Sequence, residues 1–217
     1  MNWTTVIIVI LLIIIGYILW RALSSSSNIS TGTTKLVTPT TIVATSSTNS
    51  FTFSTWIAIN TWVNGGNNLI KTPSATPTFA LTLGTVTNDL TLAFTTTPAT
   101  SPVTISNIVP LQTWASIIVS VNNGNSVDVY VNGKLVKTFA LNGVYTLLAG
   151  DVIVGGAAGT STGYISTTLD TKSIGPQDAW NIYSSGFGGG GGDDFFNKYK
   201  IRFAFVKDNV ELSRLDI

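Results

Sequence analysis

The sequence contains no cysteine and no histidine, and it has a single glutamate, Glu211. Without cysteine the chain forms no disulfide, so its fold must be stabilised by its own hydrophobic core. Nucleophilic catalysis by cysteine or by a serine–histidine pair is excluded, and so are metal sites built from histidine or cysteine. The function must therefore depend on other side chains or on extended surfaces.

Charged residues are also scarce, at 10% of the chain compared with roughly 25% in an average soluble domain. No acidic residue precedes Asp89, whereas nearly half of all charged side chains lie in residues 193–217. The formal net charge of +1 argues against a nucleic-acid partner. The C-terminal segment is thus a different kind of sequence from the middle of the chain.

The first 20 residues, MNWTTVIIVILLIIIGYILW, carry no charged side chain, and Arg21 follows them. A helix of this length spans about 30 Å, the thickness of the hydrocarbon core of a bilayer. A cleaved signal peptide would have a basic start and a shorter apolar run. We therefore predict a single-pass transmembrane anchor over residues 1–21, and Arg21 predicts that the following domain faces the cytoplasm. The anchor residues include Val6, Ile10, Ile14, Trp20 and Arg21.

Residues 22–50 are rich in serine and threonine and predict an extended stalk, with one short strand near Lys35–Val37 or Thr41–Ala44. From Phe51 onward apolar residues alternate with polar ones, which is typical of half-buried β-strands. Asn132-Gly133 predicts a type I′ hairpin turn. Pro176 and the spacing that follows it predict one short helix. We expect an antiparallel sandwich over residues 51–186. Its strands are FTFSTWIAI, FALTLG, DLTLAFT, TWASIIVSV, SVDVYV, KLVKTFAL, DVIVGG and GYISTTLD.

The most specific pattern in this domain is W-x-x-I-x-V-x-x-N-x-G-x-x-V-x-V-Y-V-N-G, which begins at Trp114. With the strands around it, this pattern resembles the concanavalin A-like lectin/glucanase superfamily, in particular its laminin-G-like branch. The resemblance implies an all-β, concanavalin A-like jelly-roll sandwich of two curved antiparallel sheets. The full expected architecture adds the N-terminal transmembrane helix and a C-terminal β-type arm.

Glucanases of this superfamily carry Glu-x-Asp-x-Glu on one strand, because glycoside hydrolysis needs two carboxylates. This chain has no such strand, so we expect no enzymatic activity. Family calcium sites use loop aspartates, and Asp89, Asp151 and Asp170 are weak candidates here. Aspartates at turns and strand ends are more often structural, so we expect no metal and no cofactor.

Sugar binding, the other family function, requires exposed aromatic rings beside amide groups. Trp62 with Asn64 and Asn67 is the candidate glycan platform, and the alternative is that Trp62 ends a strand and packs at the core edge. The patterns around Trp56, Trp114 and Trp180 predict that these three side chains belong to the core.

Five glycines, Gly188–Gly192, lie near the end of the chain, and residues 187–192 are predicted to form a flexible joint. The following segment, residues 193–217, contains NKYKIRFAFV, which alternates cleanly between basic and apolar residues. We predict a partner-binding arm that joins either its own sandwich or a neighbouring protein. Its basic face carries Lys198, Lys200 and Arg202, and its apolar face carries Tyr199, Ile201, Phe203 and Phe205.

These features favour a non-enzymatic, membrane-anchored tether over the alternative, a membrane-displayed lectin that binds carbohydrate. A membrane-anchored domain of this type resembles the minor capsid proteins of large DNA viruses that contain a membrane. The expected location is a virion membrane, with the domain on the cytoplasmic or capsid side. The expected partners are membrane lipid, other structural proteins such as capsid proteins, and glycans for the lectin alternative, but not nucleic acid.

Overall fold

The computed structural model describes residues 29–64, 67–74, 78–156 and 161–187, together with the backbone of 202–207 and 210–216. Residues 26–187 form one compact unit, and the C-terminal strands belong to a second unit. The predicted anchor over residues 1–21 and the glycines of the predicted joint, Gly188–Gly192, lie outside the described residues. Among the described residues, no helix has the length and apolar character needed to cross a bilayer.

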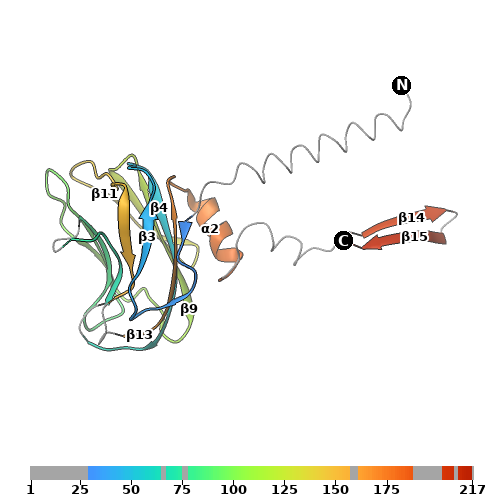
Figure 1. Cartoon of the computed structure of the whole chain (residues 1–217), viewed down its shortest axis with the longest axis horizontal. Coiled ribbons are helices and arrows are strands. Elements are labelled where there is room, and N and C mark those ends of the chain that lie inside the picture. The colour runs from blue at the N-terminus through green and yellow to red at the C-terminus, as the bar shows by residue number, and fades with distance from the viewer. Residues whose placement is uncertain are drawn as a thin grey trace, which may run out of the picture. The chain divides into compact units, whose positions relative to one another are not determined.

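Two antiparallel sheets face one another in the first unit (Figure 1). Sheet A runs in the order β1-β13-β4-β9-β10-β11, and β2 also pairs with β13. Sheet B runs in the order β3-β12-β5-β6-β7-β8. The strands of sheet A are β1 (Ile29–Ser30), β2 (Thr34–Lys35), β4 (Phe51–Thr61), β9 (Trp114–Asn122), β10 (Ser126–Val131), β11 (Lys134–Ala140) and β13 (Thr162–Asp170). Those of sheet B are β3 (Thr40–Ala44), β5 (Asn67–Lys71), β6 (Phe79–Leu83), β7 (Leu90–Phe94), β8 (Val103–Ile105) and β12 (Gly150–Val154). This arrangement confirms the predicted two-sheet antiparallel sandwich.

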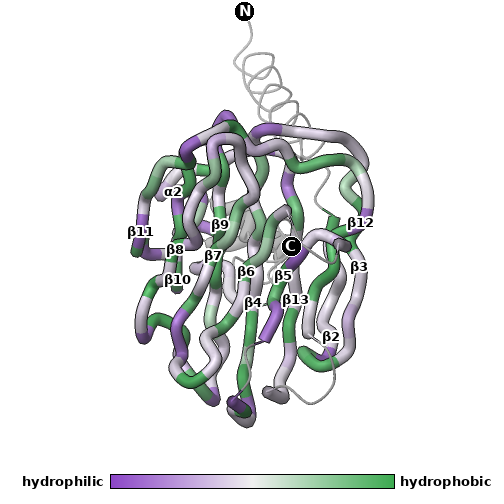
Figure 2. The backbone as a smooth tube through the Cα atoms, turned by 90° about the vertical axis from the view of Figure 1, so that its left-hand side faces the viewer, coloured by the Kyte–Doolittle hydropathy of each residue, from purple (hydrophilic) through white to green (hydrophobic). Residues whose placement is uncertain are grey.

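Alternation in the sequence determines which side chains enter the core. Along β4, the odd-numbered positions from Phe51 to Ile59 are buried between the sheets, and the side chain of Trp56 leaves the opposite face. Hydrophobic segments recur along the strands of both sheets in Figure 2, while hydrophilic ones gather in the turns. At the centre of the core lies a group of rings with centroids 5.1–6.4 Å apart, a separation typical of favourable aromatic pairs. It contains Phe51, Phe53, Phe79, Phe94 and Tyr145.

The hairpin of β10 and β11 confirms the predicted tight turn. Val131 pairs with Lys134, so Asn132 and Gly133 form the two-residue loop, and both have a positive φ, 49° and 74°. A type I′ turn requires this conformation at both positions, which glycine and asparagine adopt most easily. The turn thus sets the pairing of β10 with β11 next to it.

One short helix, α2 (Pro176–Ser184), packs against the outer side of sheet A, as Figure 1 shows. Ala179 of this helix is buried against Ile118 of β9 and Tyr130 of β10. Pro176 occupies the first turn, where a missing N–H costs the helix nothing. The predicted helix is confirmed, and it covers part of a sheet face that would otherwise contact solvent.

The predicted stalk requires a correction from Ile29 onward. Ile29 and Ser30 pair with Leu169 and Thr168 of β13, and β3 pairs with β12 along five residues. Leu36 is fully buried in the core. The sandwich therefore begins before Phe51. Its first strands are short, have little amphipathic pattern of their own and are stabilised by pairing with distant strands, so the sequence pattern did not reveal the true start of the sandwich.

Candidate functional site

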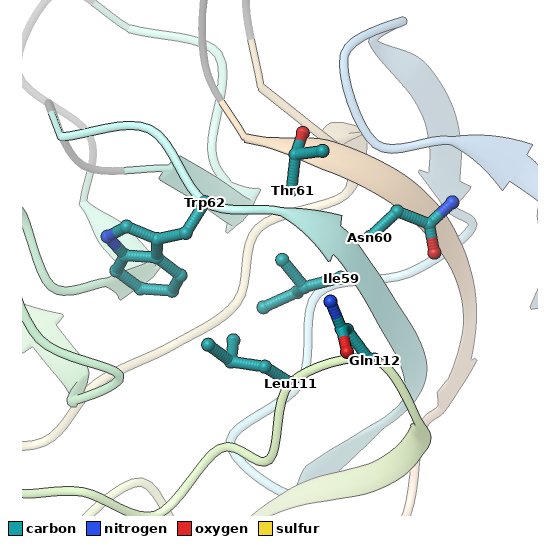
Figure 3. A pocket seen from close by; sticks show the side chains of 6 residues that line it. All are labelled: Ile59, Asn60, Thr61, Trp62, Leu111 and Gln112. Carbon is teal, nitrogen blue, oxygen red and sulfur yellow. The ribbon is translucent and has the colours of Figure 1, made fainter.

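A pocket of about 450 Å³ opens at the end of β4. The loop before β9 forms its other wall, so segments about 50 positions apart in the sequence meet there (Figure 3). The six lining residues include no charged side chain. They are Ile59, Asn60, Thr61, Trp62, Leu111 and Gln112. The pocket therefore combines amide and hydroxyl groups with apolar surface in a neutral setting.

Two amide side chains, those of Asn60 and Gln112, are the polar groups that the pocket offers to a ligand. Both residues are exposed, and neither amide has a hydrogen-bond partner among the described residues. The backbone N–H of Gln112 donates to the carbonyl of Ile59 at 2.9 Å, which joins the two walls. Gln112 has a φ of 57°, so the loop reverses sharply at this residue. The side chain of Thr61 is hydrogen-bonded to that of Thr162 and is less available.

Trp62 follows the last residue of β4 and points away from Asn60 in Figure 3. Its ring is half-buried and packs against the hydrophobic core. The indole Nε1 is buried, and within the described part of the chain it has no hydrogen-bond partner. Trp62 thus packs at the core edge while also lining the pocket, which is the alternative that the sequence left open.

The structure removes Asn67 from the candidate glycan platform. The residue is 1% exposed, its Nδ2 donates to Ser161 Oγ at 3.0 Å, and its Oδ1 accepts from the Ser161 N–H at 2.8 Å. An amide with both ends engaged inside the fold offers nothing to a ligand. Asn64 is exposed beside this position, so of the two asparagines only Asn64 remains accessible.

The aspartates considered for calcium lie in different parts of the sandwich. Asp89 precedes β7 and accepts hydrogen bonds of 2.7 Å from the Thr87 hydroxyl and the Asn107 N–H. These two bonds lower the pKa of the Asp89 carboxyl. Asp151 is exposed on β12, and Asp170 ends β13 in the other sheet. The described residues contain no group of three or more potential metal ligands from histidine, cysteine, aspartate and glutamate.

A second surface, which the sequence did not reveal, lies on the outer side of sheet A beside α2. We call it the aromatic face. The prediction that Trp56, Trp114 and Trp180 belong to the core is wrong: Trp180 is 47% exposed, and the other two are half-buried on the outer side of their strands. Trp56 and Ala58 occupy alternate positions on the outward side of β4, and this alternation is the signal that could have assigned Trp56 to the outer face. The aromatic face consists of Trp56, Trp114, Tyr164, Trp180, Tyr183 and Phe187.

The predicted C-terminal arm is described only in part. The described strand begins at Arg202: β14 (Arg202–Lys207) pairs antiparallel with β15 (Val210–Asp216) in a two-stranded sheet. Arg202, Phe203 and Phe205 therefore lie on β14, whereas Lys198, Tyr199, Lys200 and Ile201 are outside the described residues. The anchor residues Val6, Ile10, Ile14, Trp20 and Arg21 are outside them as well.

The two-sheet sandwich with a neutral pocket at one end is that of a lectin-type domain. Residues 30–174 match the model of the concanavalin A-like lectin/glucanases superfamily, named Laminin_G_3. The chain belongs to this superfamily, as the sequence pattern around Trp114 predicted. No curated protein sequence matches the chain.

Solved structures with the same fold include binding domains of botulinum neurotoxins. The receptor-binding domain of botulinum neurotoxin D has 12% identity and a TM-score of 0.58, over 70% of this chain and 43% of that one. The neurotoxin DC binding domain in complex with rat synaptotagmin II has 16% identity and a TM-score of 0.55, over 74% and 47%. The same domain in complex with SialylT has 15% identity and a TM-score of 0.56, over 74% and 47%. This chain therefore spans less than half the length of these toxin chains, and the similarity establishes the fold.

Proposed function

We propose that the sandwich is a non-catalytic module that binds a neutral glycan in the pocket at the end of β4. The observation that carries this proposal is the pair of unengaged amides, Asn60 and Gln112, in a pocket that no charged side chain lines. A primary amide has both donors and acceptors, so it can bind two neighbouring sugar hydroxyls. Leu111, which is 46% exposed, adds an apolar contact for the C–H face of a sugar ring.

The comparisons favour this binding function over the structural tether that the sequence suggested. The superfamily is named for its lectins, and the structural neighbours are named as receptor-binding domains. One of these neighbours is in complex with SialylT and another with rat synaptotagmin II. A glycan carried on a partner protein is compatible with both kinds of ligand.

The absence of acidic residues from the pocket supports a non-enzymatic role. Hydrolysis of a glycosidic bond needs two carboxyl groups that flank it, roughly 5–10 Å apart. None of the six lining residues is acidic, and the only glutamate of the sequence, Glu211, belongs to β15 rather than to the sandwich. The module would therefore hold a glycan without cleaving it.

We further propose that the module is displayed on a membrane by the predicted anchor, residues 1–21, whose 20 uncharged residues match the thickness of a bilayer. Resistance of the full chain to extraction from membranes by carbonate tests this part. Complete release by carbonate would contradict it, and protease protection of the intact chain would then establish on which side the sandwich lies.

The second candidate function is the tether that links a membrane to a protein shell. One observation favours it: β14 and β15 pair with each other, so this basic and apolar segment forms a separate two-stranded sheet. A small sheet with two exposed edges can bind a neighbouring protein by strand addition. Deletion of residues 193–217 should abolish association with shell proteins if the tether is correct, and should leave glycan binding intact.

The glycan-binding proposal is tested by screening the chain on an array of neutral and sialylated glycans. We expect Asn60→Ala to reduce the affinity for the selected neutral glycan at least tenfold, because the loss of a hydrogen-bonded amide leaves sugar hydroxyls unpaired. Asn49→Ala is the matched control, since Asn49 is an exposed amide just before the opposite end of β4. Equal affinities of the two variants would overturn the assignment of the pocket.

A further inference from the structure

The exposed aromatic side chains of the sandwich are concentrated on one side. Among the described residues, the large hydrophobic side chains that remain exposed include three aromatic ones, which are Tyr164 at 41%, Trp180 at 47% and Phe187 at 38%. All three belong to the aromatic face, on the outer side of sheet A. On the outer side of the described strands of sheet B, the exposed large hydrophobic residue is aliphatic, Val43 of β3. The two broad faces of the sandwich therefore differ in chemistry.

Ring contacts join most of this surface into one layer. Phe187 stacks on Trp114 with centroids 3.8 Å apart and meets Trp56 edge-on at 6.2 Å. Trp56 stacks on Tyr183 at 6.1 Å, and Tyr183 contacts Trp180 at 5.6 Å. A layer held by these contacts has a fixed shape and keeps several rings partly exposed, although burying them would be favourable.

Few charged side chains lie among these rings in the described part of sheet A. Across the sheet, one row consists of Lys35, Tyr164, Ala58 and Trp114, and the next row consists of Ser166, Trp56 and Ser116. Two rows further on, the outer side of the sheet carries Asp170 and Asp128, at a distance along the strands of about 20 Å from Tyr164. The aromatic face thus has one base, Lys35, in the row of Tyr164 and one acid, Asp178, on α2, so neither sign of charge predominates there.

The chain both enters and leaves the sandwich beside sheet A. The chain enters through β1, which pairs with β13, and it leaves at Phe187, which lies on the aromatic face. Residues 22–28 connect β1 to the predicted anchor, and so few residues reach at most roughly 25–30 Å. A sandwich on such a short connection stays close to the bilayer surface.

We infer that the aromatic face is a membrane-contact surface, with which the sandwich lies against the headgroup region of the bilayer that holds its anchor. Tryptophan and tyrosine side chains favour this region because their rings are apolar and their N–H and O–H groups remain hydrated. Because Lys35 and Asp178 give the face no excess of either charge, it favours contact with zwitterionic lipid. This inference rests on the membrane display proposed above.

The absence of cysteine permits a direct test, because a single introduced cysteine can carry one nitroxide label. The full chain is reconstituted into phosphatidylcholine vesicles as Tyr164→Cys, Trp180→Cys or the control Val43→Cys, which is exposed on sheet B. We expect labels at 164 and 180 to be at least threefold less accessible to a water-soluble nickel chelate than the label at 43. Two positions on the face keep the test decisive if one variant fails to fold.

Each alternative outcome contradicts a different statement. A chain that carbonate washes off the vesicles overturns the anchor and, with it, the membrane-contact inference. A chain that stays embedded, with labels at 164, 180 and 43 equally accessible to the nickel chelate, overturns the inference alone. Protection of position 164 by an added glycan but not by lipid would identify the aromatic face as a sugar surface and would also overturn it.

Discussion

Asn67 and Ser161, which are 94 positions apart in the sequence, are joined by two hydrogen bonds of 2.8 and 3.0 Å inside the sandwich. Ser161 Oγ also accepts a hydrogen bond of 2.8 Å from the backbone N–H of Val63. This network connects the start of β5 to the residue after Trp62 and so holds one border of the pocket. An amide that the sequence assigned to a ligand instead positions the chain around the site.

The Asn67 network predicts a loss of stability that is separate from ligand contact. Asn67→Ala leaves the Ser161 N–H buried without its partner, and this should lower the free energy of unfolding by about 1–3 kcal/mol. Asn64→Ala changes an exposed side chain and should stay within about 0.5 kcal/mol of the wild type. Urea denaturation of both variants measures the difference, and equal stabilities would contradict the structural role of Asn67.

The hairpin glycine predicts a steric effect beyond its backbone conformation. Gly133 has a φ of 74°, and a Cβ there would approach Trp180 Cε3 to 2.9 Å. Gly32 also has a positive φ, 66°, with open space around it. Gly32→Ala should therefore cost about 1–2 kcal/mol for the backbone alone, whereas Gly133→Ala should cost about 1–3 kcal/mol more for the overlap. Thermal unfolding compares the two, and similar losses would show that α2 yields freely to the added methyl group.

The buried phenol of Tyr145 predicts a loss of stability at alkaline pH. Burial raises the pKa of Tyr145 above its usual value of 10.0, and a hydrogen bond with the Thr78 hydroxyl only partly offsets this. Because the folded state holds the proton more tightly, its stability is complete below pH 10 and falls as the pH rises through the folded pKa. Tyr145→Phe should flatten this decline in urea melts between pH 9 and 11. An unchanged alkaline slope would contradict the assignment.

Trp62 should contribute to stability through its ring rather than through its N–H group. The indole Nε1 has no partner within the described part of the chain, so Trp62→Phe removes a buried polar atom and retains most of the packing. We expect Trp62→Phe to lie within about 1 kcal/mol of the wild type, and Trp62→Ala to lose about 2–4 kcal/mol. Equal losses in chemical denaturation would instead indicate a hydrogen bond made by the indole.

Local patterns predicted most of the sandwich because alternation and turn chemistry act over a few residues. Asn132-Gly133 identified its hairpin, and the odd-numbered residues from Phe51 identified the core side of β4. Before Phe51, β3 corresponds to the candidate strand at Thr41–Ala44. By contrast, β1 escaped prediction and β2 only borders the other candidate, because each has two residues and is held by β13, which lies more than 120 positions later in the sequence. No local signal reports such a distant partner.

The site was predicted less well for the same physical reason. Trp62 was predicted as part of a glycan platform and does line the pocket, but Asn60 and Gln112 meet only because the loop before β9 folds back to the end of β4. Asn67 carried the correct chemistry and was the wrong choice, since burial engages its amide with Ser161. Residue type alone cannot separate a free amide from an engaged one, whereas the tertiary contacts can.

The most direct test of the proposed function is the response of individual side-chain amides to a glycan. In nuclear magnetic resonance spectra of the ¹⁵N-labelled chain, titration with the neutral glycan selected on the array should shift the side-chain NH₂ signals of Asn60 and Gln112 together and saturably. The NH₂ signal of Asn49, just before the opposite end of β4, should stay unchanged. Unmoved signals of Asn60 and Gln112 in the presence of bound glycan would contradict the placement of the ligand in this pocket.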